Sequence, residues 1–147
     1  MIELRAARST DAGTIGSILS EFVAKTTWMP QLHTQAQDIA HAGAMIERGW
    51  VTVAVQDNKV IGFAARNQTE LNALYVAHQM RGQQVGTRLL EHLKEQTDVL
   101  SLWTFQANQP AKTFYLKHGF RDVERTDGAG TEEKLPDIHF KWQREAL

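Results

Sequence analysis

Residues 74–90 hold the side chains and glycines whose spacing best suits a binding site for phosphate. A strand-like run leads into a loop that contains Gly82 and Gly86, and a helix opens where the loop ends. The first turn of a helix leaves backbone N–H groups without intrahelical partners, and the helix dipole favours negative charge there. Arg81 and Arg88 add positive charge beside the loop. The pattern indicates a phosphate site, but two glycines and an arginine are also typical of a plain turn.

A second segment, residues 108–120, follows one strand further along the chain. Asn108 is a typical N-cap residue, Pro110 suits the first helical turn, and Gly119 suits the position just after a helix ends. The segment therefore predicts a short helix, and Tyr115 lies inside it.

Together the two segments resemble the GCN5-related N-acetyltransferase (GNAT) family, whose members transfer acyl groups from coenzyme A. The pyrophosphate loop of that family reads Arg/Gln-x-x-Gly-x-Gly/Ala, and residues 81–86 occupy it. The residue-level resemblance is concentrated in residues 74–120, whereas the resemblance in element order covers nearly the whole chain. The later family signature, Asn-x-x-Ala-x-x-Phe-Tyr-x-x-x-Gly-Phe, is matched at Asn108, Ala111, Phe114, Tyr115, Gly119 and Phe120.

The resemblance implies acetyl-CoA, or another acyl-CoA, as co-substrate and an amine as acceptor. It also implies that backbone groups of the strand before the loop pair with the pantetheine arm, as an added strand would. Asn108 could hydrogen-bond this arm or simply cap its helix, and the two roles are compatible. The residues expected to bind the cofactor are Leu74, Tyr75, Val76, Arg81, Gly82, Gln83, Gln84, Val85, Gly86, Thr87 and Asn108.

Gln84 departs from the family pattern, because the first glycine of the loop usually stands at this position. Glycine there lets the backbone approach the pyrophosphate without a Cβ atom in the way. If φ is negative, Gln84 fits and only crowding by its side chain matters. If φ is positive, a non-glycine residue costs on the order of 1 kcal/mol. We expect acyl-CoA binding to survive, and it could be weaker than the family norm.

Tyr115 is the general acid that the resemblance implies, since its phenol would protonate the departing CoA thiolate. The alternative is that Tyr115 only packs beneath its helix as a core aromatic. The acceptor amine must lose a proton before it attacks the thioester, and Glu70 is the first candidate base. His33 is a second, and His33 and Trp28 are expected to bind the acceptor. Glu70 could equally be an exposed strand-end residue, and His33 a solvent-facing loop residue.

The apolar periodicity predicts one α/β (α+β) domain over residues 1–147, with the element order βααβββαβαββ. By resemblance, this order implies a mixed, mostly antiparallel sheet of about six or seven strands, flanked by about four helices. The strand over residues 99–105 should splay away from the strand over 70–76 and leave a cleft for the thioester. The other strands are expected near 2–6, 50–56, 60–66, 120–125 and 138–142, and the helices over 12–23, over 35–48 with Thr34 as N-cap, from Val85 and after Asn108.

The composition excludes several classes of protein. Sixteen Lys and Arg against seventeen Asp and Glu argue against nucleic-acid binding. No apolar run approaches the roughly 18 residues of a membrane span, and the first residues lack signal-peptide features, so we expect a cytoplasmic protein. The absence of cysteine excludes disulfides, thiolate metal sites and a cysteine-linked acyl-enzyme. The six histidines show no metal-ligand spacing, and we therefore expect no metal.

The near-zero net charge of −1 joins two regions of opposite sign. Residues 81–121 carry six basic and three acidic residues, and this basic region coincides with the expected phosphate-binding elements. Residues 122–137 carry six acidic and two basic residues, and most of this region is a polar loop. The loop could gather a cationic acceptor or be an ordinary solvated surface loop.

These observations favour an acyl-CoA-dependent N-acyltransferase that acts by direct attack of a small-molecule amine on acetyl-CoA. A protein-amine acetyltransferase is one alternative. A second alternative is a non-catalytic acyl-CoA-binding or interaction domain, which Gln84 and the uncertain base support and Tyr115 opposes. A homodimer is possible if the final strand, residues 138–142, is exposed and pairs with a second copy.

Overall fold

Apolar residues at helical and alternating spacing produce helices and strands in the expected order. The computed structural model describes residues 1–145. Its element order, βααβββαβαββ, confirms the predicted fold class, with two short 3-10 turns added. The elements are β1 (Glu3–Ala6), η1 (Ser9–Asp11), α1 (Ala12–Lys25), α2 (Gln35–Glu47), β2 (Val51–Gln56), β3 (Lys59–Asn67), β4 (Glu70–Val76), η2 (His78–Met80), α3 (Val85–Gln96), β5 (Val99–Phe105), α4 (Gln109–Lys117), β6 (Arg121–Thr126) and β7 (Asp137–Gln143).

Two helix starts follow from capping side chains that the sequence predicts. The Thr34 hydroxyl accepts a hydrogen bond from the backbone N–H of Gln37 at 3.1 Å, and the Gln37 side chain accepts one from the N–H of Thr34 at 2.8 Å. This reciprocal pair begins α2. The side-chain oxygen of Asn108 accepts from the N–H of Ala111 at 3.2 Å, so the predicted N-cap of α4 is confirmed.

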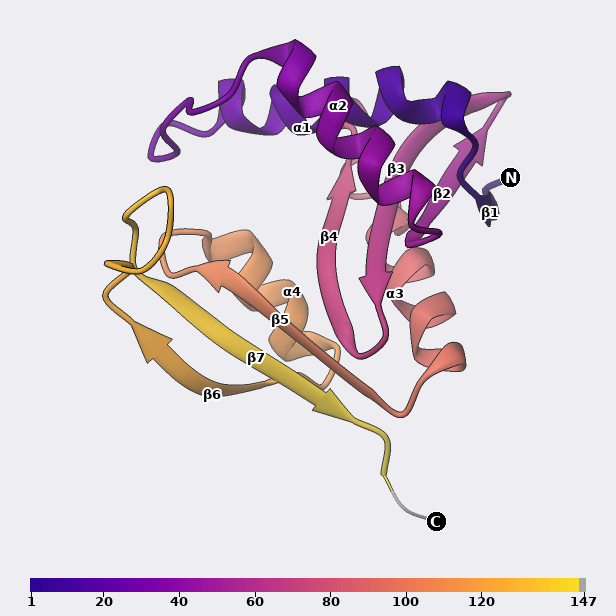
Figure 1. The fold of residues 1–147 in the computed structure, drawn as a ribbon. Helices are drawn as coiled ribbons and strands as arrows, with labels where there is room; N and C mark the ends of the chain where they lie inside the picture. Colours follow the sequence, from indigo (N-terminus) through magenta and orange to yellow (C-terminus); the bar gives the residue numbers. More distant parts are fainter. Residues whose placement is uncertain (146–147) are drawn as a thin grey trace.

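The seven strands form one sheet in the order β1-β2-β3-β4-β5-β7-β6. All neighbouring strands are antiparallel except β4 and β5, which are parallel and register only at Glu70 and Ser101. The N–H of Ser101 also donates to the carbonyl of Thr69 at 2.8 Å. Beyond this point β5 turns away from β4, as Figure 1 shows, so the predicted splay is confirmed.

The final strand is not an edge strand, which corrects the suggested route to a dimer. β7 pairs with β5 along one side and with β6 along the other. Its backbone hydrogen-bonding groups are therefore already paired within the sheet, and pairing of residues 138–142 with a second copy is excluded. The edge strand of this half of the sheet is β6.

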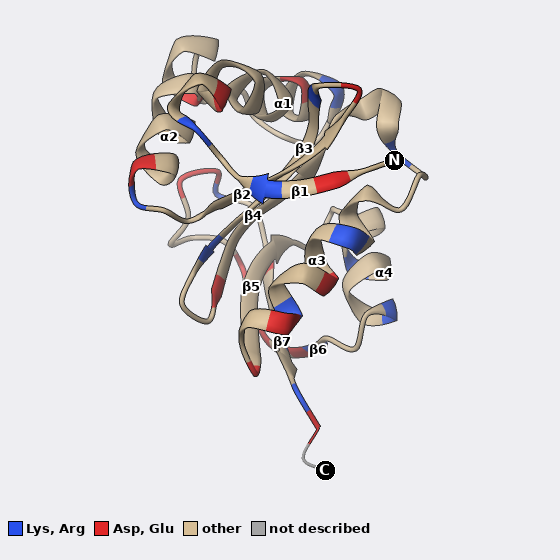
Figure 2. Ribbon diagram, turned by 90° about the vertical axis from the view of Figure 1, so that its right-hand side faces the viewer, with Lys and Arg blue, Asp and Glu red and all other residues tan. Residues whose placement is uncertain are grey.

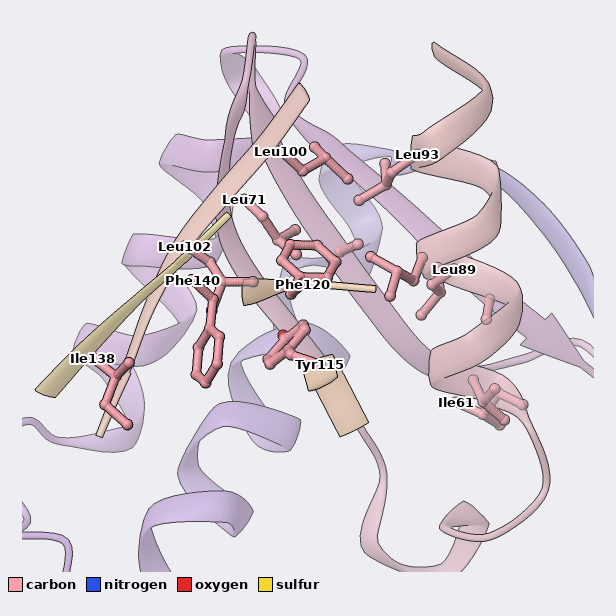
Figure 3. Close-up of a cluster of buried hydrophobic side chains, with 14 residues drawn as sticks. Ile61, Leu71, Leu89, Leu93, Leu100, Leu102, Tyr115, Phe120, Ile138 and Phe140 are labelled. Carbon is pink, nitrogen blue, oxygen red and sulfur yellow. The ribbon is translucent and has the colours of Figure 1, made fainter. Parts of the chain in front are cut away.

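Helices cover both faces of the sheet and bury two separate hydrophobic clusters. α1 and α2 lie over one face of β2 to β4, where Ile15, Met45 and Phe63 are buried. α3 and α4 lie on the other side, and their cluster includes Leu89, Tyr115 and strand residues of both halves of the sheet (Figure 3). This second cluster holds the two splayed halves together beneath the gap between β4 and β5. Among residues 1–145 no helix is long and apolar enough to cross a membrane.

Candidate functional site

A cavity of about 580 Å³ opens where β4 and β5 part. Its walls come from four places: the end of α1 with the segment after it, the last three residues of β4, the loop into α3, and α4. The structure thus brings together segments that are far apart in the sequence. Every residue predicted to bind the cofactor lines this cavity except Gln83.

The charged residues around this cavity are all basic. Lys25, Arg81 and Lys117 line it, and no carboxylate does so among the described residues. Figure 2 shows that the charged positions of α4 are basic, and they are Lys112 and Lys117. α3 adds its N-terminus, where no side chain caps the first turn. A cavity with these walls suits a ligand with several negative charges.

Gln84 adopts the left-handed conformation, with φ 68° and ψ 15°, directly before α3. Of the two signs of φ considered for Gln84, the positive and more costly one therefore occurs. A residue with a Cβ atom is strained in this region by about 1 kcal/mol, whereas glycine adopts it freely. Gln84 also lines the cavity, so its side chain occupies space beside the N-terminus of α3.

Gln84→Gly should therefore raise the free energy of unfolding by up to about 1 kcal/mol and lower the Kd for an anionic cavity ligand. Urea denaturation and calorimetric titration with acetyl-CoA measure the two effects. Gln83→Gly is the matched control, because Gln83 does not line the cavity and has no positive φ. The same change in the free energy of unfolding in Gln84→Gly and Gln83→Gly would contradict the strain at Gln84.

Tyr115 packs in the core and also lines the cavity, so its position is compatible with both of the roles considered for it. Its ring is 7 % exposed and packs against Phe114 and Phe120, with ring centroids 5.2 and 5.3 Å away. The residue also lines the cavity, and no hydrogen bond joins its hydroxyl to another residue in the described part of the chain. Burial, together with the nearby Tyr75, raises the pKa of Tyr115 far above its ordinary value. The phenol thus keeps its proton and can donate it to a group in the cavity.

His118 is a cavity residue that the sequence reasoning missed, although it lies inside the second motif. Its Nε2 lies 3.2 Å from the hydroxyl of Thr87, so it links the ends of α4 and α3. Burial lowers the pKa of His118, and the positive charges of Lys94 and Lys117 lower it further. The imidazole is accordingly neutral at pH 7 and adds no charge to the cavity wall.

A smaller cavity of about 150 Å³ adjoins the larger one and has the opposite charge. Phe22 and Tyr75 line both cavities, so the two meet at these rings. Asp38 and Glu133 line the smaller cavity, and no Lys or Arg does so among residues 1–145. Its two imidazoles belong to His33 and His41.

The two residues predicted to bind the acceptor, Trp28 and His33, line different cavities. Trp28 lines the larger cavity and packs edge-on against Phe105, with ring centroids 5.8 Å apart. His33 lines the smaller cavity, and its Nε2 lies 3.1 Å from a carboxylate oxygen of Glu132. The second contact ties the segment after α1 to the loop between β6 and β7.

Glu70 is exposed and lines neither cavity, so the assignment of Glu70 as the base does not fit this structure. It registers with Ser101 at the point where β4 and β5 still touch. The cavity is reached only at Leu74, about 13 Å further along the strand at the usual rise per residue. The correction follows from the direction of β4, which starts at the closed end of the splay and finishes at the open end.

The loop between β6 and β7, residues 127–136, is held at its base by the end of β5. The side-chain amide of Gln106 donates to the carbonyls of Thr126 and Asp137, at 3.2 Å each. The N–H of Gln106 donates to the carbonyl of Pro136 at 2.9 Å. The hydroxyl of Thr126 also hydrogen-bonds the carboxylate of Asp137. These bonds hold the loop beside the smaller cavity, which Glu133 of the loop lines.

Gly128→Ala should disrupt the conformation of the loop between β6 and β7. Gly128 has a φ of 81°, and a Cβ atom there would lie 2.0 Å from the carbonyl oxygen of Leu135. We expect a loss of about 1–3 kcal/mol in unfolding free energy, measured by urea denaturation. Gly130→Ala is the matched control, because it lies in the same loop with open space around its Cβ position. A Gly128→Ala variant as stable as Gly130→Ala would contradict the described loop.

The comparison with protein families decides the identity of the fold. A family model described as an acetyltransferase (GNAT) domain matches residues 47–122, which is more than half of the chain. The chain belongs to the GNAT acetyltransferase family. The match covers β4, the loop into α3 and α4, which form three of the walls of the larger cavity.

Individual GNAT proteins support the same assignment. A peptidyl-lysine N-acetyltransferase of Salmonella typhimurium, YjaB, is 33 % identical over 78 residues. That alignment covers 53 % of each protein, so the chain spans about half the length of this curated relative. The solution structure of apo YjaB from Escherichia coli has a TM-score of 0.81, with 20 % identity over 99 % of both chains. Salmonella typhimurium yncA, solved with acetyl-CoA, has a TM-score of 0.78, with 18 % identity over 100 % of this chain and 96 % of that one. These two structures share the GNAT fold.

Proposed function

We propose that this GNAT protein is an acyl-CoA-dependent N-acyltransferase that moves the acetyl group of acetyl-CoA directly to an amine. The observation that carries this proposal is the pair of adjoining cavities with opposite charge. The larger one has basic walls, a free helix N-terminus and the protonated phenol of Tyr115. The smaller one has two carboxylates. A polyanionic donor and a cationic acceptor would thus meet near Tyr75, which lines both cavities.

The residues of the larger cavity fit the chemical parts of coenzyme A. Lys25, Arg81 and Lys117, with the N–H groups that begin α3, would hold its phosphates. The last residues of β4 pair with β3 on one side only, because β5 has already turned away. Their free backbone groups along Leu74–Val76 would bind the amides of the pantetheine arm, as an added strand does.

Tyr115 would act as the general acid when the thioester is cleaved. The amine nitrogen forms a bond to the acetyl carbonyl carbon as the carbon–sulfur bond breaks, and sulfur leaves with the bonding electrons. The sulfur takes a proton from the Tyr115 phenol. The phenol is neutral again once a proton lost by the attacking nitrogen reaches it. Direct transfer of this kind needs no cysteine, and the chain contains none.

The acceptor class has two candidates. A small-molecule amine is the first, since the smaller cavity has a volume of only about 150 Å³. The lysine side chain of a protein is the second, and the similarity to YjaB, a peptidyl-lysine N-acetyltransferase, favours it. A cytoplasmic location is consistent with either acceptor. A homodimer stays a prediction, with an interface other than β7.

Release of free thiol from acetyl-CoA tests the proposal. The protein is incubated with acetyl-CoA and a panel of polyamines, amino acids, aminoglycosides and lysine peptides, and the thiol is followed with a chromogenic disulfide. We expect thiol release that depends on the amine. Tight binding of acetyl-CoA with no turnover across the panel would instead favour a non-catalytic acyl-CoA-binding domain.

A further inference from the structure

The loop between β6 and β7 presents two neighbouring glutamates to different surroundings. Glu132 has a side chain that is 61 % exposed and pairs with His33. Glu133 is half-buried and lines the smaller cavity. No ion pair of the described residues includes Glu133. Its carboxylate is thus available to a ligand, whereas that of Glu132 already has a partner.

The position of Glu133 follows from the order of the loop. The N–H of Thr131 donates to the carbonyl of Gly128 at 3.0 Å, and the Lys134 ammonium donates to the carbonyl of Ala129 at 2.9 Å. These bonds hold the residues on either side of Glu133. In Figure 1 the loop lies opposite the connection between α1 and α2, which forms the other side of the smaller cavity.

The other ionisable groups of this cavity are less suited to receive a proton from an amine near the larger cavity. The carboxylate of Asp38 already accepts a hydrogen bond from the hydroxyl of Ser20 at 2.6 Å. His33 is paired with Glu132, and His41 is an exposed residue of α2. Tyr75 lines both cavities; burial raises its pKa, and the negative charge of Glu133 raises it further. Glu133 therefore acts electrostatically on the residue at which the two cavities meet.

Aromatic rings lie between the two cavities, since Phe22 and Tyr75 line both. Phe22 lies edge-on to Tyr75 and to Trp28, with centroid distances of 5.1 and 6.5 Å. Trp28 in turn contacts Phe105, which lines the smaller cavity. Aromatic walls accommodate an alkyl chain and stabilise a nearby ammonium group. The carboxylate of Glu133 and these aromatic rings together favour an acceptor that carries an ammonium group at the end of an apolar chain.

We propose that Glu133 binds the ammonium group of the acceptor and removes its proton, and that the acceptor is a primary amine on an unbranched alkyl chain. This inference rests on the proposed function. It assigns the role of base to Glu133 instead of Glu70, which lines neither cavity. The acceptor, R–NH₃⁺, gives one proton to the Glu133 carboxylate, which later passes it to solvent. The neutral nitrogen then attacks the acetyl carbon, and the second proton that it loses replaces the one given by Tyr115 to sulfur.

Glu133→Gln separates this role from a structural one, because the amide keeps the size of the side chain and loses its charge. We expect kcat/KM for n-butylamine to fall about 100-fold at pH 7, with the Kd for acetyl-CoA unchanged. The deficit should shrink as the pH approaches about 10.4, where the amine loses its proton without help. A merely structural residue would give a deficit independent of pH.

Two further variants identify the group. Glu132→Gln is the matched control from the same loop and should keep the wild-type rate, since an exposed ion pair contributes little. Asp38→Asn should lower the rate by less than Glu133→Gln. A wild-type rate in Glu133→Gln, or a pH-dependent deficit in Asp38→Asn in its place, would overturn the assignment.

A binding experiment keeps this inference distinct from the proposed function. Calorimetric titration of the CoA-loaded protein with n-butylammonium chloride should give a Kd that rises at least about tenfold in Glu133→Gln. If the wild-type protein released no thiol with any amine, the proposed function would fail and this titration would still test the site. Equal affinities in the wild type and Glu133→Gln would overturn the inference even if acetyl transfer occurs.

Discussion

Tyr115→Phe should lower the turnover number for acetyl transfer by about 100-fold or more and leave the Kd for acetyl-CoA nearly unchanged. The phenol is the buried, protonated hydroxyl of the larger cavity, and no residue of the described chain holds it by a hydrogen bond. Its removal therefore takes away a proton donor without leaving a polar partner unsatisfied. Steady-state kinetics at saturating acetyl-CoA, with calorimetry for the Kd, measure the two quantities.

The pH dependence of this variant gives a second readout. The raised pKa of Tyr115 means that the phenol stays neutral well above pH 9, so the wild type retains the acid throughout that range. The ratio of wild-type to Tyr115→Phe turnover should therefore be constant from about pH 6 to pH 9. A ratio that falls steeply with rising pH would show that another group donates the proton, and an unchanged turnover number would remove Tyr115 as the acid.

The free energy of unfolding provides the control for Tyr115→Phe. Because the ring of Tyr115 packs against Phe114 and Phe120, phenylalanine should fill the same space at nearly the same stability. Tyr115→Ala is unsuitable, since removal of a buried aromatic ring costs about 3–5 kcal/mol and would confuse loss of fold with loss of chemistry.

Local patterns predicted much of the fold because they depend on interactions between neighbours along the chain. Thr34 and Asn108 cap helices through bonds that span three residues, and both caps occur as expected. Of the residues predicted to bind the cofactor, all except Gln83 line the larger cavity, but its lining residues Lys25 and His118 were not predicted. By contrast, the place of β7 between β5 and β6 depends on pairing between distant strands, and alternation of apolar residues in one strand does not specify its neighbours.

The choice of a base depends on tertiary structure in the same way. Glu70 begins β4 and Glu133 lies in the loop between β6 and β7, and the local sequence of neither residue shows whether it reaches the cavities. The splay directs Glu70 away from the cavities, and the bonds from Gln106 bring the loop of Glu133 towards them. The φ of Gln84 was also open, because glutamine at that position is compatible with either sign until the fold determines the backbone.

Gly86→Trp should raise the Kd for acetyl-CoA by about 100-fold or more. Gly86 is the second residue of α3 and lines the larger cavity beside the N–H groups that would hold phosphate. A Cβ atom there would lie 3.4 Å from Cζ of Phe114 and 3.9 Å from Cγ2 of Val76. Phe114 and Val76 line the cavity as Gly86 does, so an indole at this position would extend into the cavity. It would occupy the space that the pyrophosphate needs and cover the helix N-terminus.

Gly86→Ala is the matched control for this prediction, because one methyl group fits at ordinary contact distance from Phe114. Alanine also favours the helix by up to about 1 kcal/mol, so this variant should be at least as stable as the wild type. Calorimetry gives the Kd, and urea denaturation verifies that Gly86→Trp is still folded. A folded Gly86→Trp protein with wild-type affinity would exclude the N-terminus of α3 as the phosphate site. Gly86→Trp also tests whether the two cavities bind independently. In the absence of CoA, Gly86→Trp and the wild type should bind n-butylammonium at Glu133 with equal affinity, because the smaller cavity does not include Gly86.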